Sequence, residues 1–74
     1  MRNIEKGSVY HHFKGNDYVV IEIGVNTETN EEMVVYKSLL NDKVWIRPLT
    51  MFLSKVDKEK YPNVKQEYRF QLKD

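Results

Sequence analysis

Alternating hydrophobic and polar positions run through the first two thirds of the chain and predict a series of short strands. Residues 8–14 are the first expected strand, and Gly-Asn-Asp at 15–17 suits a tight turn because these residues tolerate positive φ. Residues 18–24 resume with a period of two and form a second strand. The apolar positions on one face of that strand are Val19, Ile21 and Ile23. The pattern therefore predicts an antiparallel hairpin.

The same pattern continues after a polar loop at 26–30, with strands expected at 32–38 and 43–47. Pro48 ends the fourth strand because proline has no N–H to donate, and residues 49–53 are long enough for one helical turn. A short strand is expected at 54–56. Tyr68, Phe70 and Leu72 alternate with polar residues, which predicts a last strand that pairs with its own sheet or with a neighbouring subunit.

These elements predict an all-β, mainly antiparallel fold, a small SH3-like barrel of about five strands. One short helical turn follows the fourth strand, and an extra strand lies at the C-terminus. A chain of 74 residues is sufficient for one domain, so we expect residues 1–74 to form a single unit. Its core is expected at residues 7–56, a polar connection at 57–66 and the terminal strand at 67–73.

Composition narrows the class of protein. Hydrophobic residues make up 41% of the chain and charged residues 31%, which is typical of a globular domain. The chain has no cysteine, no apolar run that could span a membrane, and a polar start unlike a signal peptide, so we expect it in the cytoplasm. A net charge of +1 does not favour nucleic acid as a partner. A thin core and open strand edges favour a homo-oligomer.

Catalytic and metal-binding patterns are missing from the sequence. No nucleophile with a base, carboxylate pair or glycine-rich phosphate loop stands at a recognisable spacing, so we expect no enzyme and no cofactor. His11 and His12 are adjacent on an expected strand and point to opposite faces, so they cannot share one metal ion. We place His11 with Val9 and Phe13 at the core edge, and His12 on the other face with Tyr10 and Lys14.

Trp45 and Arg47 are the most informative pair, because they project from one face of the fourth expected strand. An indole beside a guanidinium can bind a flat or anionic ligand. The alternative is structural: Trp45 caps the core and Arg47 pairs with a glutamate of the next strand. Tyrosines on strands have the same two interpretations, packing or binding. The candidate ligand-binding face comprises Tyr10, His12, Lys14, Tyr36, Trp45 and Arg47.

Three ordered motifs resemble a family of short bacterial and phage proteins that is known only as a domain of unknown function. They are Tyr-His-His-Phe-Lys-Gly-Asn-Asp-Tyr at 10–18, Met-Val-Val-Tyr at 33–36 and Trp-Ile-Arg-Pro-Leu-Thr-Met-Phe at 45–52. The resemblance covers about residues 7–56. The family often has Arg where this chain has His11, and the tail after Val56 departs from it. The resemblance implies no activity.

We therefore expect a non-catalytic binding module. Aromatic rings can stack on a base while Lys, Arg and a titratable His meet phosphate, so a small anionic, nucleotide-type ligand is the first hypothesis. In a phage, such a module could sequester or sense a host signalling nucleotide as an anti-defence sponge. A protein-interaction adaptor that uses an SH3-like aromatic face is the alternative. Weak nucleic-acid binding is a second alternative.

Overall fold

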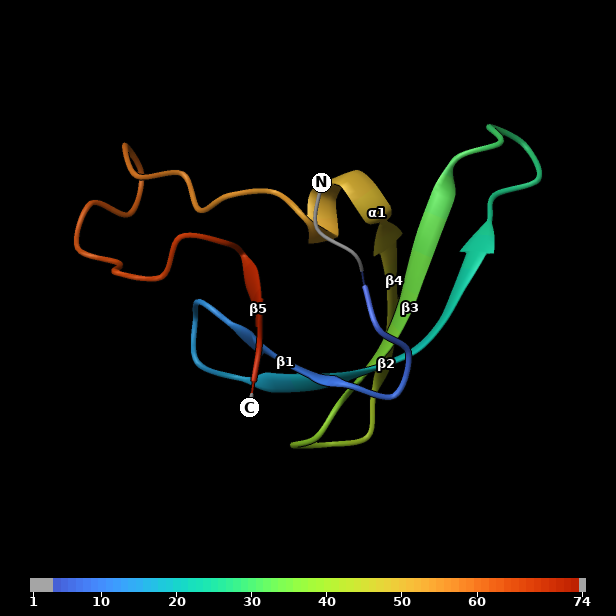
Figure 1. Ribbon diagram of the computed structural model, residues 1–74, viewed down its shortest axis with the longest axis horizontal. Coiled ribbons are helices and arrows are strands. Elements are labelled where there is room, and N and C mark those ends of the chain that lie inside the picture. Colours follow the sequence, from blue (N-terminus) through green and yellow to red (C-terminus); the bar gives the residue numbers. More distant parts are fainter. Residues whose placement is uncertain (1–3, 74) are drawn as a thin grey trace.

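Five antiparallel strands and one helical turn make up the protein in a computed structural model, which describes residues 4–73 (Figure 1). Residues 1–3 and 74 of the expected domain lie outside the described residues. The elements are β1 (Val9–His12), β2 (Asp17–Val25), β3 (Glu32–Ser38), β4 (Val44–Pro48), α1 (Leu49–Phe52) and β5 (Phe70–Leu72). They confirm the antiparallel β class and the short helical turn after the fourth strand. The sheet order is β4-β3-β2-β1-β5.

Tight turns connect the first four strands, as the polar clusters in the sequence predict. Gly15 has φ of +116°, a value that glycine adopts without the steric cost of a Cβ atom, and its N–H donates to the His12 carbonyl at 2.8 Å. Asn30 and Asp42 take φ near +60° in the next two turns, where their short polar side chains are tolerated.

A β-bulge interrupts β2 and moves its apolar residues from one face to the other. Val20 pairs with Tyr36, whereas Glu22 pairs with Val35, so Ile21 is the extra residue. Before the bulge Val20 faces the core with 1% exposure, and after it Ile23 shares a face with the buried Val34. The expectation that Val19, Ile21 and Ile23 lie on one face is therefore wrong.

The faces of β1 are also the reverse of those expected. Tyr10 is only 3% exposed and belongs to the core, so the inward face of β1 carries Tyr10 and His12. Val9 and His11 lie on the outer face instead. His11 Nδ1 is 2.6 Å from Asp17 Oδ1, and Lys73 Nζ is 2.6 Å from the other carboxylate oxygen. These contacts lower the pKa of Asp17, chiefly through the hydrogen bond from Lys73.

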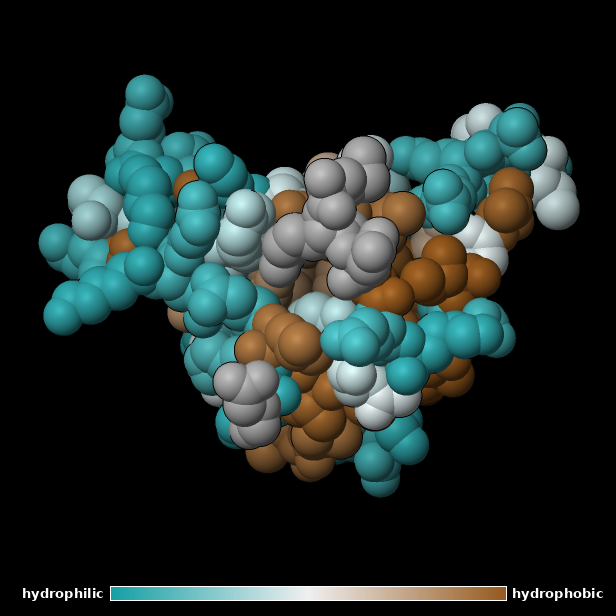
Figure 2. Space-filling model, in the orientation of Figure 1, coloured by the Kyte–Doolittle hydropathy of each residue, from teal (hydrophilic) through white to brown (hydrophobic). Residues whose placement is uncertain are grey.

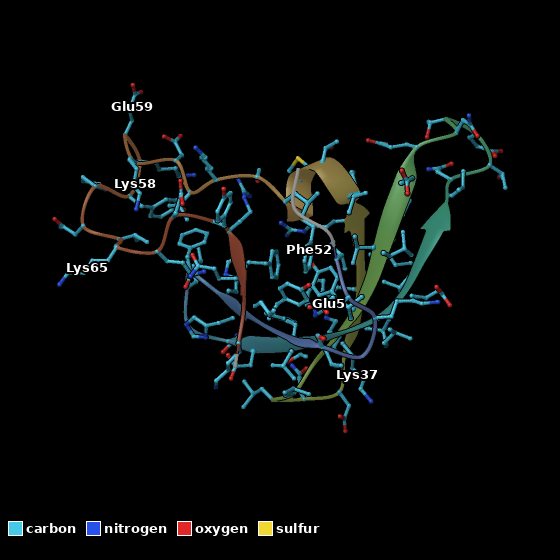
Figure 3. The ribbon with its side chains drawn as sticks, viewed as in Figure 1. Glu5, Lys37, Phe52, Lys58, Glu59 and Lys65 are labelled. Carbon is cyan, nitrogen blue, oxygen red and sulfur yellow. The ribbon has the colours of Figure 1, made fainter. Side chains whose placement is uncertain are left out.

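Aromatic rings occupy the centre of the core. Phe52 points from α1 toward the strands (Figure 3) and stacks on Phe70, with ring centroids 4.1 Å apart and planes 8° apart. Tyr10 and Tyr36 each meet Phe52 edge to face at 5.4 Å. The one helical turn thus closes the concave face of the curved sheet.

The sheet is open, with β4 and β5 as its edges, so the closed barrel expected from the sequence is not formed. The expected strand at 54–56 is reduced to a single bridge between Lys55 and Tyr68. Two backbone bonds flank it, from Val56 N–H to the Glu67 carbonyl and from Arg69 N–H to the Ser54 carbonyl. Between these paired segments, residues 57–66 form a loop that we call the strap, drawn orange in Figure 1.

The strap extends beyond the sheet and is largely hydrophilic, whereas apolar surface shows near the middle of the molecule (Figure 2). No helix in the described part of the chain is long and apolar enough to cross a membrane.

Candidate functional site

A cavity of about 460 Å³ lies on the concave side of the sheet. Its walls come from segments far apart in the sequence: the β1–β2 turn, β4, the strap, and the chain that enters β5. This volume lies in the range of about 300–1,000 Å³ that small-molecule sites usually have.

Phe70 is 1% exposed and forms the floor of the cavity. Three rings surround it with centroid distances of 4.7 Å to His12, 5.7 Å to Tyr18 and 5.4 Å to Tyr36. Burial raises the pKa of Tyr36, although the positive charge of Arg47 acts in the opposite direction. The floor is therefore an aromatic surface whose phenol at Tyr36 stays neutral at physiological pH.

The β4 wall carries the two side chains that the sequence singles out. Trp45 pairs with Tyr36 and Arg47 pairs with Val34, which places both on the concave face. Trp45 keeps 43% of its surface exposed, with Lys43 Nζ 4.7 Å from the ring.

Arg47 lies over the floor instead of pairing with a glutamate. Its guanidinium carbon is 5.4 Å from the Phe70 ring centroid. Its Nη1 atom is buried and has no hydrogen-bond partner among residues 4–73, and the same holds for Nε of Arg69. Both arginines line the cavity. A buried donor without a partner costs free energy, so these two atoms mark the place where an acceptor would be stabilised.

His12 stands in the positive field of these groups. Burial is the largest cause that lowers its pKa, from 6.5 to about 4, and Arg47, Lys14 and Arg69 add to the effect. The Lys14 backbone N–H donates to His12 Nδ1 at 3.1 Å, so the neutral ring carries its proton on Nε2. At neutral pH, His12 therefore adds a neutral donor to the site.

The strap supplies the outer wall. Tyr61 meets Phe13 edge to face at 5.0 Å, and Lys14 Nζ lies 5.5 Å from the Tyr61 ring. A hydrogen bond from Lys14 is the main cause that lowers the Tyr61 pKa. Gln66 ties the strap to β1, because its Nε2 donates to the His11 carbonyl at 2.9 Å and to the Tyr68 carbonyl at 2.8 Å.

The structure brings together five of the six residues of the candidate face. They are His12, Lys14, Tyr36, Trp45 and Arg47. Tyr10 does not line the cavity, because it packs in the core and its hydroxyl oxygen accepts the Glu5 backbone N–H at 3.1 Å. The packing interpretation of the tyrosines holds for Tyr10. Tyr36 both packs in the core and lines the cavity.

Sequence reasoning missed the lining residues of the strap and of the chain entering β5. The sequence predicts only a polar connection at 57–66, whereas the strap contributes Asp57, Lys60 and Tyr61 to the lining. Arg69 and Phe70 were assigned only to a terminal strand. One sequence signal for these residues exists. A cationic residue stands next to an aromatic residue in Lys60-Tyr61 and in Arg69-Phe70, much as Arg47 stands two residues from Trp45. Phe13 and Tyr18 complete the lining.

Positive charge dominates the site. Among residues 4–73, four Lys or Arg side chains and a single carboxylate, Asp57, line the cavity. No three His, Asp or Glu side chains within residues 4–73 come together as a metal ion would require. The arrangement is suited to bind an anion through charge-assisted hydrogen bonds beside stacked rings.

Comparison with known proteins gives a family but no activity. Neither a curated protein nor a solved structure shows a significant match to the chain. A family profile matches residues 8–72, which includes the tail where the sequence resemblance was expected to end. Since the match spans most of the 74 residues, the chain belongs to the family described as Protein of unknown function (DUF1653).

Proposed function

We propose that this protein is a non-catalytic module that binds a small anionic ligand containing a flat ring, such as a nucleotide. The observation that carries the proposal is the pair of buried, unpartnered donors, Arg47 Nη1 and Arg69 Nε, in an aromatic cavity. Both guanidinium groups line the cavity, so an anion bound there would accept charge-assisted hydrogen bonds from them, and such bonds are stronger than neutral ones.

The aromatic lining supports the ring component of the ligand. Trp45 is partly exposed at the cavity wall and offers an indole face, and stacking of a base on an aromatic ring is worth about 1–3 kcal/mol. The Tyr18 and Tyr36 rings lie edge to face at 5.3 Å and extend the apolar surface between the floor and β4.

The chemistry of the lining favours binding over catalysis. Among the described residues that line the cavity there is no Ser or Thr hydroxyl and no thiol, and Asp57 is the single carboxylate. His12 has no carboxylate among the causes that shift its pKa, so an orienting acid of the kind found in nucleophile–His–acid triads is not indicated. A module that holds its ligand unchanged could act as a sensor, or in a phage as a sponge for a host signalling nucleotide.

Isothermal titration with nucleotides, using purified wild-type protein and single-residue variants, tests the proposal. Trp45→Ala and Arg47→Ala are expected to abolish binding, because they remove the stacking surface and an anion donor, while circular dichroism shows the fold unchanged. Leu40→Ala is a matched control, because Leu40 is 77% exposed and does not line the cavity. Retained affinity in both cavity variants would contradict the proposed site.

A protein-interaction adaptor is the second candidate, and it rests on the partly exposed Trp45 in an aromatic cavity, since peptide-binding modules dock partners on aromatic-lined grooves. The adaptor hypothesis predicts that a partner protein binds at Trp45 and that nucleotides do not bind there. Weak nucleic-acid binding would instead show a steep loss of affinity with salt.

A further inference from the structure

The cations of the cavity comprise two arginines and two lysines, and an aromatic ring lies near Arg47 and another near both lysines. The inner pair is Arg47 and Arg69, with the Arg47 guanidinium carbon 5.4 Å from the Phe70 centroid. The outer pair is Lys14 and Lys60, whose Nζ atoms lie 5.5 Å and 5.6 Å from the centroid of Tyr61.

The two pairs lie at different depths. Phe70 is 1% exposed and stacked on Phe52 in the core, so the inner pair belongs to the cavity floor. Tyr61 lies on the strap and meets Phe13 of the β1–β2 turn, so the outer pair belongs to the rim. Within residues 4–73 the inner donors Arg47 Nη1 and Arg69 Nε are buried without partners, whereas the outer ammonium groups lie near a partly exposed ring.

Four cations and one carboxylate of the described residues line the cavity, so a single phosphate of about −2 leaves positive charge uncompensated. Like charges that converge on one cavity repel, and Asp57 is the only carboxylate in the lining among the residues that the structure describes. A single phosphate on the floor would satisfy the buried arginine donors and leave the two lysines at Tyr61 uncompensated. The rim therefore has capacity for a second anionic group.

We infer that the ligand carries two linked anionic groups, one held by Arg47 and Arg69 on the floor and one by Lys14 and Lys60 at the rim. A nucleoside diphosphate has this chemistry, whereas a nucleoside monophosphate fills only the inner position. This inference rests on the proposed function, since it specifies the ligand class of the same cavity.

Isothermal titration with nucleosides, their 5′-monophosphates and their 5′-diphosphates over four bases tests the inference. The diphosphate of the preferred base is expected to bind about tenfold or more tightly than its monophosphate, as one further charge-assisted interaction implies. A Lys14→Gln, Lys60→Gln double variant should weaken both ligands, but the diphosphate by about tenfold more than the monophosphate, so that the advantage of the diphosphate disappears.

Lys65→Gln is the matched control, because Lys65 lies on the same strap, points away from the sheet (Figure 3) and does not line the cavity. It removes one positive charge from the strap outside the cavity and should keep the diphosphate advantage. Equal affinity for the mono- and diphosphate would overturn the inference and leave the proposed function standing. Equal weakening of both ligands in the double variant would also overturn it. No binding of any nucleotide would remove the proposed function together with the inference.

Discussion

His12 is the residue whose titration reports most directly on the cavity. Its pKa of about 4 results first from burial and then from the charges of Arg47, Lys14 and Arg69. We expect a ¹H–¹⁵N NMR titration of the free protein to give this low value, and Arg47→Gln to raise it because one repelling charge is lost. Bound phosphate should also raise it. Lys37→Gln, on another strand and outside the cavity, should leave the value unchanged.

The same shift has a consequence for stability. Between pH 6.5 and about 4 the unfolded chain binds a proton at His12 that the folded chain does not, so the free energy of unfolding falls as the pH drops through this window. Above pH 6.5 the His12 ring is neutral in both the folded and the unfolded chain, so its titration no longer lowers the free energy of unfolding. Urea unfolding at pH 7 and pH 5 should therefore show a smaller loss in His12→Asn than in the wild type. An equal loss in both proteins would contradict the role of His12.

At the scale of elements, α1 packs on the core through Leu49 and Phe52, and only Phe52 is fully buried. Phe52 is fully buried and stacked on Phe70, so Phe52→Ala is expected to cost about 3–5 kcal/mol of the free energy of unfolding. The neighbouring Met51 is 46% exposed, and Met51→Ala on the same turn should change it by less than about 0.5 kcal/mol. Urea denaturation of both variants measures the difference. Similar effects would show that α1 does not hold the core.

Local pattern predicted the strands well, because period-two alternation and turn residues are properties of short segments. The four hairpin strands and the helical turn all lie close to their expected positions. The face of the sheet on which each side chain lies could not be predicted. The bulge at Ile21 exchanges the two faces of β2, and only the pairing with β3 reveals the bulge. Tyr10 was misplaced for a related reason: alternation shows that Tyr10 and His11 face opposite ways, but not which one faces the core.

At the scale of the whole molecule, the cavity could be predicted only in part. His12, Trp45 and Arg47 are recognisable because each stands in a strand with a conspicuous neighbour. Tyr61 and Arg69 reach the same cavity because the strap returns the chain from α1 to the far edge of the sheet, and no local pattern encodes that closure. The residues that could not be predicted are therefore those that the path of the chain brings to the cavity from distant parts of the sequence.

The open sheet leaves β4 as an edge strand with exposed apolar side chains. Ser38 N–H donates to the Lys43 carbonyl, so alternation along the ladder directs the backbone groups of Trp45 and Arg47 toward β3. Those of Val44 and Ile46 then face the free edge. Val44 is 52% exposed and Ile46 is 64% exposed. Unpaired backbone groups beside apolar surface favour pairing with a second copy of the chain.

Native mass spectrometry tests this expectation of a dimer through antiparallel pairing of two β4 strands. Ile46→Lys should give a monomer, because pairing about a two-fold axis at this strand brings the new charges of the two copies close together and like charges across strands are destabilising. Val25→Lys is the matched control, since Val25 is 58% exposed at the end of β2 and lies off the free edge of β4. It should remain a dimer like the wild type. A monomeric wild type would show that the exposed edge stays unpaired, and a dimer that persists in Ile46→Lys would assign the interface to another surface.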